Sequence, residues 1–245
     1  GGAAMGGAFA IALVPAIGAS STLLLGRVGL HAAAGAGAVV ASALLAWFLA
    51  RDRSGRSDAA LLVGVTVNAF SWALVAVVRA ALPADRTQIL SVWLVGSIGY
   101  PEAFDLVVAA VATIAGVTAL VVVAGDLALL SAGEDDAARL GVNLGRTKLV
   151  AYAAASALVG VSVSTSGVIG FVGLIAPHAV RLALGRDDRV VIPASALAGA
   201  LALVVFDAFA RASFVVFPSE LPTGALTAVV GAPLFALALW RKVAR

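Results

Sequence analysis

Eight long apolar runs dominate this sequence of 245 residues, and each is long enough, or nearly so, to cross a membrane as a helix. They lie at about 3–20, 29–50, 59–82, 104–124, 148–166, 168–184, 190–212 and 222–240. The run at 168–184 is the weakest, because Pro177 and His178 interrupt it, and we expect a tilted or broken crossing there. The pattern predicts an all-α fold, a polytopic membrane helix bundle with eight transmembrane helices.

Composition excludes several other classes of protein. Hydrophobic residues make up 62% of the chain and charged residues 12%, whereas an average soluble domain has about 25% charged residues. Because there is no cysteine and no polar segment long enough to fold in water, a two-domain soluble enzyme, a disulfide scaffold and a zinc–thiolate site are disfavoured. The pI of about 9.9 is high, but a net charge of +3 dispersed among apolar segments indicates membrane topology and no nucleic-acid partner.

The basic residues divide into two groups when the linkers between the runs are taken alternately. Twelve lie in the second, fourth and sixth linkers and after the last run, and four lie in the others. By the positive-inside rule the side with twelve is cytoplasmic, which predicts a multi-pass protein of the inner (plasma) membrane with a cytoplasmic C-terminus. The twelve are Arg51, Arg53, Arg56, Arg139, Arg146, Lys148, Arg181, Arg186, Arg189, Arg241, Lys242 and Arg245, and the four are Arg27, Arg79, Arg86 and Arg211.

Motifs for bond chemistry are missing from the sequence. It has no phosphate-binding loop, no H-E-x-x-H and no cluster of His, Asp and Glu at metal-ligand spacing, and His31 and His178 are each expected to stand alone. ATP binding, intramembrane hydrolysis, a metal site and a cofactor in this chain are therefore disfavoured. Transport, or a structural or signalling role, remains.

The longest predicted cytoplasmic linker, 125–148, contains a candidate short helix. Ser131 and the acidic residues 134–136 are suited to its start, and Gly141 is suited to its end. Leu140, Val142 and Leu144 add an apolar surface that the segment does not need for itself. The pattern predicts a helix presented to a cytoplasmic partner, with a solvated amphipathic loop as the alternative.

Three further features are candidates for function. The segment 162–178 combines small hydroxyl residues, glycines and a proline, which suits either a pore-related segment or a turn between helices. Asp207 and Arg211 are four residues apart in an apolar run, so they share a helix face and can pair. Arg211 is a candidate for docking or for simple anchoring at the membrane surface, and Glu220 lies at the predicted start of the last helix with Pro222 in its first turn.

Several motifs, in order, resemble the FecCD family of permeases. They are Gly167-Val-Ile-Gly-Phe-Val-Gly-Leu-Ile-Ala-Pro-His178, Gly185-Arg-Asp-Asp-Arg189 with the run from Pro193 to Ala200, Asp207-Ala-Phe-Ala-Arg211, Glu220-Leu-Pro-Thr-Gly224 and Gly231-Ala-Pro-Leu-Phe235. Leu62-Val-Gly-Val-Thr-Val-Asn68 and Val92-Trp-Leu-Val-Gly-Ser97 extend the resemblance over nearly the whole chain.

The resemblance implies a subunit of an ATP-binding-cassette importer for ferric siderophores, haem or cobalamin, with ten helices. It implies a second permease copy or a related permease, a cytoplasmic ATPase dimer that binds ATP and magnesium, and an extracytoplasmic binding protein. Family members have two further helices before a segment like 1–20, so we expect a single permease domain over 1–245 that is incomplete at its N-terminus.

The resemblance also assigns roles to individual residues. ATPase coupling is expected from the 133–145 part of the linker, binding-protein docking from Arg211 and Glu220, and an inner gate and substrate path from Ser54, Gly55, Ser57 and Asn68. The expected coupling residues are Glu134, Asp135, Ala138, Arg139, Leu140 and Gly141.

The resulting hypothesis is a permease subunit, not itself an enzyme, that moves a ferric siderophore, or haem or cobalamin, into the cytoplasm. The alternatives are a proton-coupled secondary transporter with Asp207 as carrier, a zinc or manganese permease of the same class, and a membrane scaffold that transports nothing.

Overall fold

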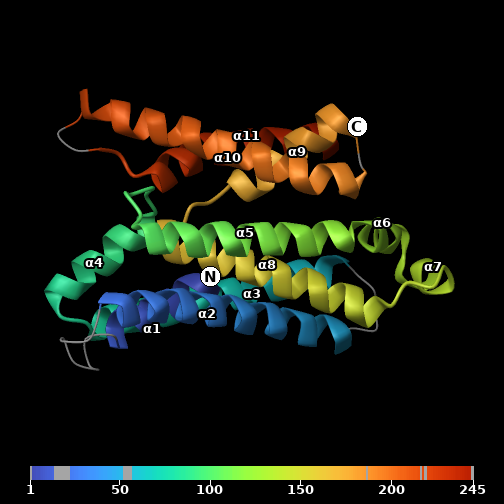
Figure 1. Cartoon of the computed structure of the whole chain (residues 1–245), viewed down its shortest axis with the longest axis horizontal. Helices are drawn as coiled ribbons and strands as arrows, with labels where there is room; N and C mark the ends of the chain where they lie inside the picture. Colours follow the sequence, from blue (N-terminus) through green and yellow to red (C-terminus); the bar gives the residue numbers. More distant parts are fainter. Residues whose placement is uncertain are drawn as a thin grey trace. The chain divides into compact units, whose positions relative to one another are not determined.

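The computed structural model describes residues 2–13, 23–51, 57–185, 187–215, 217 and 220–243, and within them the chain is entirely helical and irregular, with no strand. The helices are shown in Figure 1. Their bounds are α1 Gly2–Leu13, α2 Leu23–Arg51, α3 Ser57–Ala81, α4 Ala84–Val95, α5 Ala103–Val122, α6 Ala124–Ala132, α7 Glu134–Arg139, α8 Leu144–Ser166, α9 Val172–Leu184, α10 Asp188–Ala212, the 3-10 turn η2 Ser213–Val215, and α11 Thr223–Val243.

Each of the eight apolar runs contains a helix, which confirms the all-α membrane bundle. By length and composition, four helical stretches among the described residues can cross a membrane: Leu62–Ala81, Ala103–Val122, Leu144–Ser166 and Asp188–Ala212. The apolar stretches His31–Leu44, Val172–Leu184 and Thr223–Leu237 are shorter. The structure therefore gives four clear spans, and the count of eight stays a prediction.

Helix α4 lies in a segment that the sequence pattern left as a linker. Asp85, Arg86 and Gln88 interrupt the apolar pattern there, but Asp85 suits the first turn of a helix and the Thr87 N–H donates to the Pro83 carbonyl at 2.9 Å. Leu90 of α4 is fully buried and forms a small core with Ala8 of α1 and Val75 of α3. Burial of one side of α4 thus stabilises a helix that the apolar pattern did not predict, because charged residues interrupt that pattern.

The chain divides into two compact units, of which unit 1 comprises 1–94, 100–113 and 155–167. Its helices approach closely at glycines: a Cβ atom on Gly6 of α1 would lie 1.9 Å from the Ala33 carbonyl oxygen of α2. Gly2 packs in the same way on Gly37, and Gly160 of α8 packs on Gly35. The Ala- and Gly-rich runs therefore serve close helix packing, as is common where lipid gives helices no hydrophobic reason to associate.

Unit 2 comprises 95–99, 114–154 and 168–245. Within it α9 lies beside α10, as Figure 1 shows, and α11 contacts both. Gly224 at the start of α11 meets the 95–99 segment directly, because its N–H donates to the Gly96 carbonyl at 3.0 Å and a Cβ atom there would lie 2.1 Å from the Val95 oxygen. These close contacts position the polar residues of α10 and α11.

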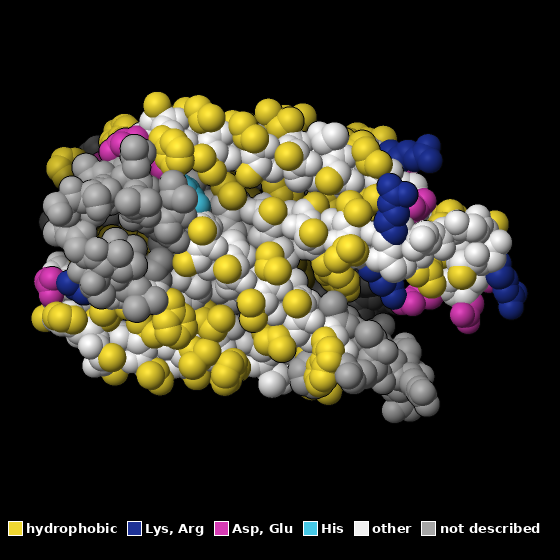
Figure 2. All heavy atoms as spheres, turned by 60° about the horizontal axis from the view of Figure 1, so that its bottom comes forward, with side chains coloured by type: hydrophobic (Ala, Val, Ile, Leu, Met, Phe, Trp, Pro, Cys, Tyr) yellow, Lys and Arg dark blue, Asp and Glu magenta, His cyan; other side chains and the backbone are white. Residues whose placement is uncertain are grey.

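Hydrophobic side chains cover much of the face shown in Figure 2. Large apolar side chains of the spans are exposed: Leu62, Ile114 and Val204 each expose about two thirds of their area. Exposed apolar surface of this extent along the spans is suited to lipid.

Candidate functional site

Helix α7 is a short, polar helix between α6 and α8. Its first turn consists of Glu134, Asp135 and Asp136, whose negative charges interact favourably with the helix dipole there. Arg139 lies in its last turn. The sequence-predicted residues Glu134, Asp135, Ala138, Arg139, Leu140 and Gly141 are all exposed, whereas Ala137 is buried. α7 therefore presents most of its surface outward.

Gly141 ends α7, as predicted. Its φ is +88°, its N–H donates to the Ala138 carbonyl, and the Val142 N–H donates to the Ala137 carbonyl, both at 3.0 Å. This pair of bonds is the Schellman arrangement, for which glycine is favoured because it adopts positive φ without strain. The predicted role of Ser131 is wrong: its hydroxyl donates to the Ala128 carbonyl at 2.7 Å, and Gly133 occupies the N-cap of α7 without a side-chain cap.

Two polar contacts tie the α6–α7 segment to the first turn of α8. Lys148 Nζ lies 2.7 Å from Glu134 Oε1, and the buried Thr147 hydroxyl donates to Asp126 Oδ2 at 3.0 Å. Asn143 caps α8 by accepting from the Arg146 N–H at 3.0 Å. Residues 124–148 are thus a folded helical segment and not a solvated loop.

Asp207 and Arg211 pair on α10, as their spacing predicts. Arg211 Nε donates to Asp207 Oδ2 at 2.7 Å, and Arg211 Nη2 donates to the Ile98 carbonyl at 2.9 Å. The buried Thr223 hydroxyl of α11 donates to the second Asp207 oxygen at 3.1 Å. We refer to Asp207, Arg211, Thr223 and the Ile98 carbonyl as the arginine cluster; it joins α10, α11 and the 95–99 segment.

The residues expected to dock a binding protein differ in their surroundings. Arg211 exposes one third of its side chain, and Glu220 is exposed just before α11. Pro222 was predicted to lie in the first turn of the last helix, but α11 begins one residue later, at Thr223. The Pro222 carbonyl accepts from the Ala225 N–H at 3.0 Å.

The structure gives partial information on the expected gate and path. Asn68 is exposed on α3, and Ser57 begins that helix, although its side chain is outside the described part. Ser54 and Gly55 lie outside the described residues.

The segment 162–178 contains a helix end, a short turn and a second helix. Near the end of α8 the Thr165 hydroxyl donates to the carbonyls of Val161 and Ser162, at 2.9 and 3.1 Å. The turn ends at Phe171, whose φ of +67° is unusual for a residue with a side chain. α9 then begins and contains both Pro177 and the exposed His178. The turn between helices is confirmed, and a pore-related role stays a prediction.

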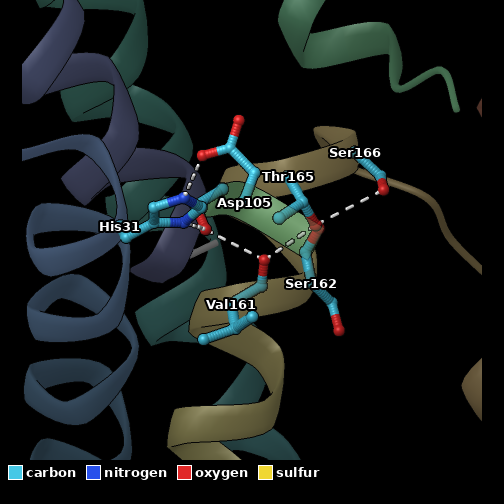
Figure 3. A network of polar contacts seen from close by, with 7 residues as sticks. His31, Asp105, Val161, Ser162, Thr165 and Ser166 are labelled. Atoms are coloured by element: carbon cyan, nitrogen blue, oxygen red, sulfur yellow. Dashed lines mark hydrogen bonds and ion pairs between the residues drawn. The ribbon is translucent and has the colours of Figure 1, made fainter. Parts of the chain in front are cut away.

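One polar cluster was missed at the sequence level, because His31 was expected to stand alone. His31 of α2 lies between Asp105 of α5 and Ser164 of α8, with Nε2 3.0 Å from Asp105 Oδ1 and Nδ1 2.5 Å from Ser164 Oγ. Figure 3 shows the imidazole directed at the Asp105 carboxylate and at the end of α8. We refer to His31, Asp105 and Ser164 as the histidine cluster. The available signal was Asp105, an acid at the start of an apolar run. Its partner His31, however, lies 74 residues away along the chain.

No group of three or more His, Asp and Glu side chains in the described ranges could hold a metal ion. The candidate sites described above are an exposed short helix, α7, and two clusters of ionisable and polar side chains.

Comparison with known proteins identifies the family. The family model described as the FecCD transport family matches residues 1–241. The chain belongs to the FecCD family. The match covers the α6–α7 segment, the arginine cluster and the histidine cluster alike, so the resemblance seen in the motifs is confirmed.

The relatives with assigned names are transport permeases. The chain is 36% identical over 192 residues to the hemin transport system permease protein HmuU of Yersinia pestis, which covers 78% of this chain and 56% of that protein. It is 36% identical over 223 residues to the cobalamin import system permease protein BtuC of Halobacterium salinarum, covering 90% and 59%. It is 34% identical over 182 residues to the Fe(3+) dicitrate transport system permease protein FecC of Escherichia coli, covering 74% and 54%.

A solved structure shares the fold. It is an inward-facing conformation of an ABC transporter assigned to the metal-chelate type, with a TM-score of 0.81 and 28% sequence identity. The match covers 98% of this chain and 73% of that one. The chain thus spans less than two thirds of the named relatives and about three quarters of the structural match.

Proposed function

We propose that this chain is the membrane permease of an ATP-binding-cassette importer that carries a ferric siderophore, or haem or cobalamin, into the cytoplasm. The observation that carries the proposal is the family match over residues 1–241, together with relatives named for hemin, cobalamin and ferric dicitrate transport. The chain would perform no bond chemistry, and ATP and magnesium would bind to a separate ATPase. Selectivity would rest largely on the binding protein, and we choose an iron–siderophore chelate as the cargo.

The proposed topology has eight crossings in this chain and a cytoplasmic C-terminus. The four clear spans and the alternation of twelve and four basic residues support it. On this topology the α6–α7 segment lies in the cytoplasm of a multi-pass inner-membrane protein, and the Arg211 end of α10 lies outside.

Helix α7 is proposed to contact the ATPase dimer. The geometry supports this because Leu140, an apolar side chain with 68% of its area exposed, directly follows α7, whose exposed side chains are mostly charged. The contacts of Lys148 with Glu134 and of Thr147 with Asp126 connect α7 to α8, so a displacement of α7 would be passed to a membrane span.

Arg211 is proposed to contact carboxylates of an extracytoplasmic binding protein, and Glu220 is proposed to contact its cationic side chains. Glu220 is exposed, and Arg211 exposes one third of its side chain. Asn68, Ser57, Ser54 and Gly55 are proposed for the path and inner gate, and a second permease copy for the other half of that path.

The alternatives receive less support. A proton carrier at Asp207 is disfavoured because both carboxylate oxygens are engaged, one by the Arg211 guanidinium and one by Thr223. A zinc or manganese permease and a scaffold without transport are disfavoured by the names of the relatives, which describe the import of chelates and tetrapyrroles.

Transport coupled to ATP hydrolysis tests the proposal. The complete permease, its ATPase and its binding protein are reconstituted in proteoliposomes, and uptake of labelled ferric siderophore, haem and cobalamin is measured beside ATP hydrolysis. Uptake of one of the three, dependent on ATP, is expected. Absence of ATP-dependent uptake of all three would contradict the proposal.

The role of α7 is tested in the same vesicles by Arg139→Ala combined with Leu140→Ser. The variant is expected to lower uptake per ATP hydrolysed by about tenfold or more, which corresponds to 1.4 kcal/mol of coupling. Arg146→Ala is the matched control, because Arg146 is equally exposed and lies a few residues away in α8. Equal coupling in both variants would contradict the role of α7.

A further inference from the structure

We propose that His31, Asp105 and Ser164 form a proton-binding site within unit 1, where one proton is taken up on His31 Nδ1 while the Ser164 hydroxyl turns away to the Val161 carbonyl. The site lies outside the α7 segment and the arginine cluster, and the inference does not rest on the proposed transport function. It follows from five heavy-atom positions and from the number of protons that these atoms can share.

The Ser164 hydroxyl has one hydrogen and two neighbours that can accept it. Its oxygen lies 2.9 Å from the Val161 carbonyl and also contacts His31 Nδ1. If the hydroxyl donates to Val161, then Nδ1 must carry a hydrogen and donate to Ser164, since two lone pairs make no hydrogen bond. If the hydroxyl donates to Nδ1, then that nitrogen is unprotonated.

The contact between His31 and Asp105 completes the count. Nε2 lies 3.0 Å from Asp105 Oδ1, and this contact needs one hydrogen in either state. In the first state the imidazole–carboxylate pair therefore holds two protons and has no net charge, whereas in the second it holds one proton and carries one negative charge. The two states differ by a single proton bound at Nδ1, and no covalent bond other than that N–H forms or breaks.

Both states keep the three helices connected. The protonated state makes three hydrogen bonds, namely Asp105 with Nε2, Nδ1 with Ser164, and Ser164 with Val161. The other state makes the first two, and the Val161 carbonyl still accepts from the Thr165 hydroxyl at 2.9 Å (Figure 3). A hydroxyl rotation is therefore sufficient for the proton to bind, without movement of α2, α5 or α8.

Charged groups of the neighbouring helices are few. α1 and the rest of α5 contribute no ionisable side chain, and α8 carries Arg146, Lys148 and Tyr152 in its N-terminal half, at least twelve residues before Ser164. α3 carries Arg79 in its last turn and Asp58 at its start, and Arg27 precedes His31 by one turn of α2; the side chains of Asp58 and Arg27 are outside the described part. Glu102 lies exposed just before α5.

The site also retains contact with its surroundings. The His31 and Asp105 side chains expose 12% and 19% of their area, so neither is fully enclosed by the described helices. Although Ser, His and Asp are the residues of a hydrolase triad, Ser164 is bound to its own helix and faces Nδ1, while the carboxylate faces Nε2, the reverse of the arrangement in that triad. Proton binding, and not acyl transfer, is the chemistry that this arrangement supports.

Nitrogen NMR tests the proposal directly. The complete permease is labelled with ¹⁵N-histidine in lipid nanodiscs, the His31 signals are assigned by their loss in His31→Gln, and spectra are recorded between pH 5 and 8.5. As the pH is lowered, His31 is expected to change from a neutral ring with hydrogen on Nε2 to a charged ring with hydrogen on both nitrogens. His178, which is exposed, serves as the internal reference for a histidine outside the cluster.

Variants then assign the partners. Asp105→Asn is expected to move the His31 transition to lower pH, because it removes the negative charge that faces Nε2. Asp85→Asn, at an exposed carboxylate of the same unit, is expected to leave the transition in place. A wild-type His31 that keeps one neutral form throughout, or a transition that Asp105→Asn and Asp85→Asn affect equally, would overturn the proposal; the first result needs no variant to fold.

Discussion

The arginine cluster and the histidine cluster each join three segments of the helix bundle, but they differ in the cation and in where it lies. In the arginine cluster the guanidinium and the carboxylate are on the same helix, four residues apart, and the guanidinium keeps its charge at any physiological pH. In the histidine cluster the imidazole and the carboxylate are on different helices, and the imidazole is the proposed site of proton uptake. The charge of the arginine cluster is thus permanent, whereas that of the histidine cluster depends on the proton of the proposed site.

The largest effect is expected when the permanent pair is broken. Asp207→Ala leaves the Arg211 guanidinium two thirds buried without its carboxylate, and we expect a loss of about 2 kcal/mol in the free energy of unfolding in detergent. The value is below that of fully buried pairs because one third of Arg211 reaches solvent. The double variant Asp207→Ala with Arg211→Ala is expected to be more stable than Asp207→Ala alone. A double variant less stable than the single one would contradict this account.

A smaller effect that varies with pH is expected in the histidine cluster. A double-mutant cycle of His31→Ala and Asp105→Ala should give a coupling energy of about 1 kcal/mol at about pH 5.5 and less at about pH 8.5. On the proposed proton binding, the pair at the lower pH is an imidazolium and a carboxylate, so attraction between opposite charges adds to the hydrogen bond that both states share. The cycle is measured from unfolding in detergent at both values of pH. The same cycle for Asp207 and Arg211 is the reference, since its coupling should not change. A coupling in the histidine cluster that is equal at both pH values would remove the difference between the two clusters.

The smallest effect is expected for the ion pair at the surface. Lys148→Met removes the contact with Glu134, in which the two side chains are 39% and 61% exposed, and should change the unfolding free energy by less than about 0.5 kcal/mol. Thr147 directly precedes Lys148, and its buried hydroxyl donates a hydrogen bond to Asp126. Thr147→Val removes this bond and should lower the unfolding free energy by about 1 kcal/mol. If Lys148→Met proves the more destabilising of the two, burial is not what distinguishes these contacts.

The difference between the clusters also explains what the sequence could predict. The pairing of Asp207 with Arg211 follows from helical spacing, and so do the start and end of α7, because the acids and Gly141 act within one turn. The eight apolar runs likewise located the main helices, since their periods and lengths are local properties. Family membership followed from motifs that are themselves contiguous.

Contacts between distant segments were beyond such reasoning. His31 lies 74 residues from Asp105 and 133 from Ser164, and nothing local indicates that α2, α5 and α8 meet there. Helix α4 was missed because its polar residues outweighed a single buried face, and the Ser131 hydroxyl was misassigned because it bonds to a carbonyl of its own helix. Each of these depends on tertiary packing or on a choice between two nearby acceptors.

Phe171 and Gly231 make one choice of sequence depend on another. The left-handed backbone at Phe171 holds a tight turn, with the Val172 N–H donating to the Gly170 carbonyl at 2.9 Å, and a Cβ atom on Gly231 would lie 2.5 Å from the Phe171 Cβ. A side chain at 231 therefore requires glycine at 171, because the clash is with the Cβ atom itself; a glycine at 171 would also relax the backbone while losing the ring that fills this space. Across homologous sequences the two positions should covary, with side chains at 231 found where 171 is glycine.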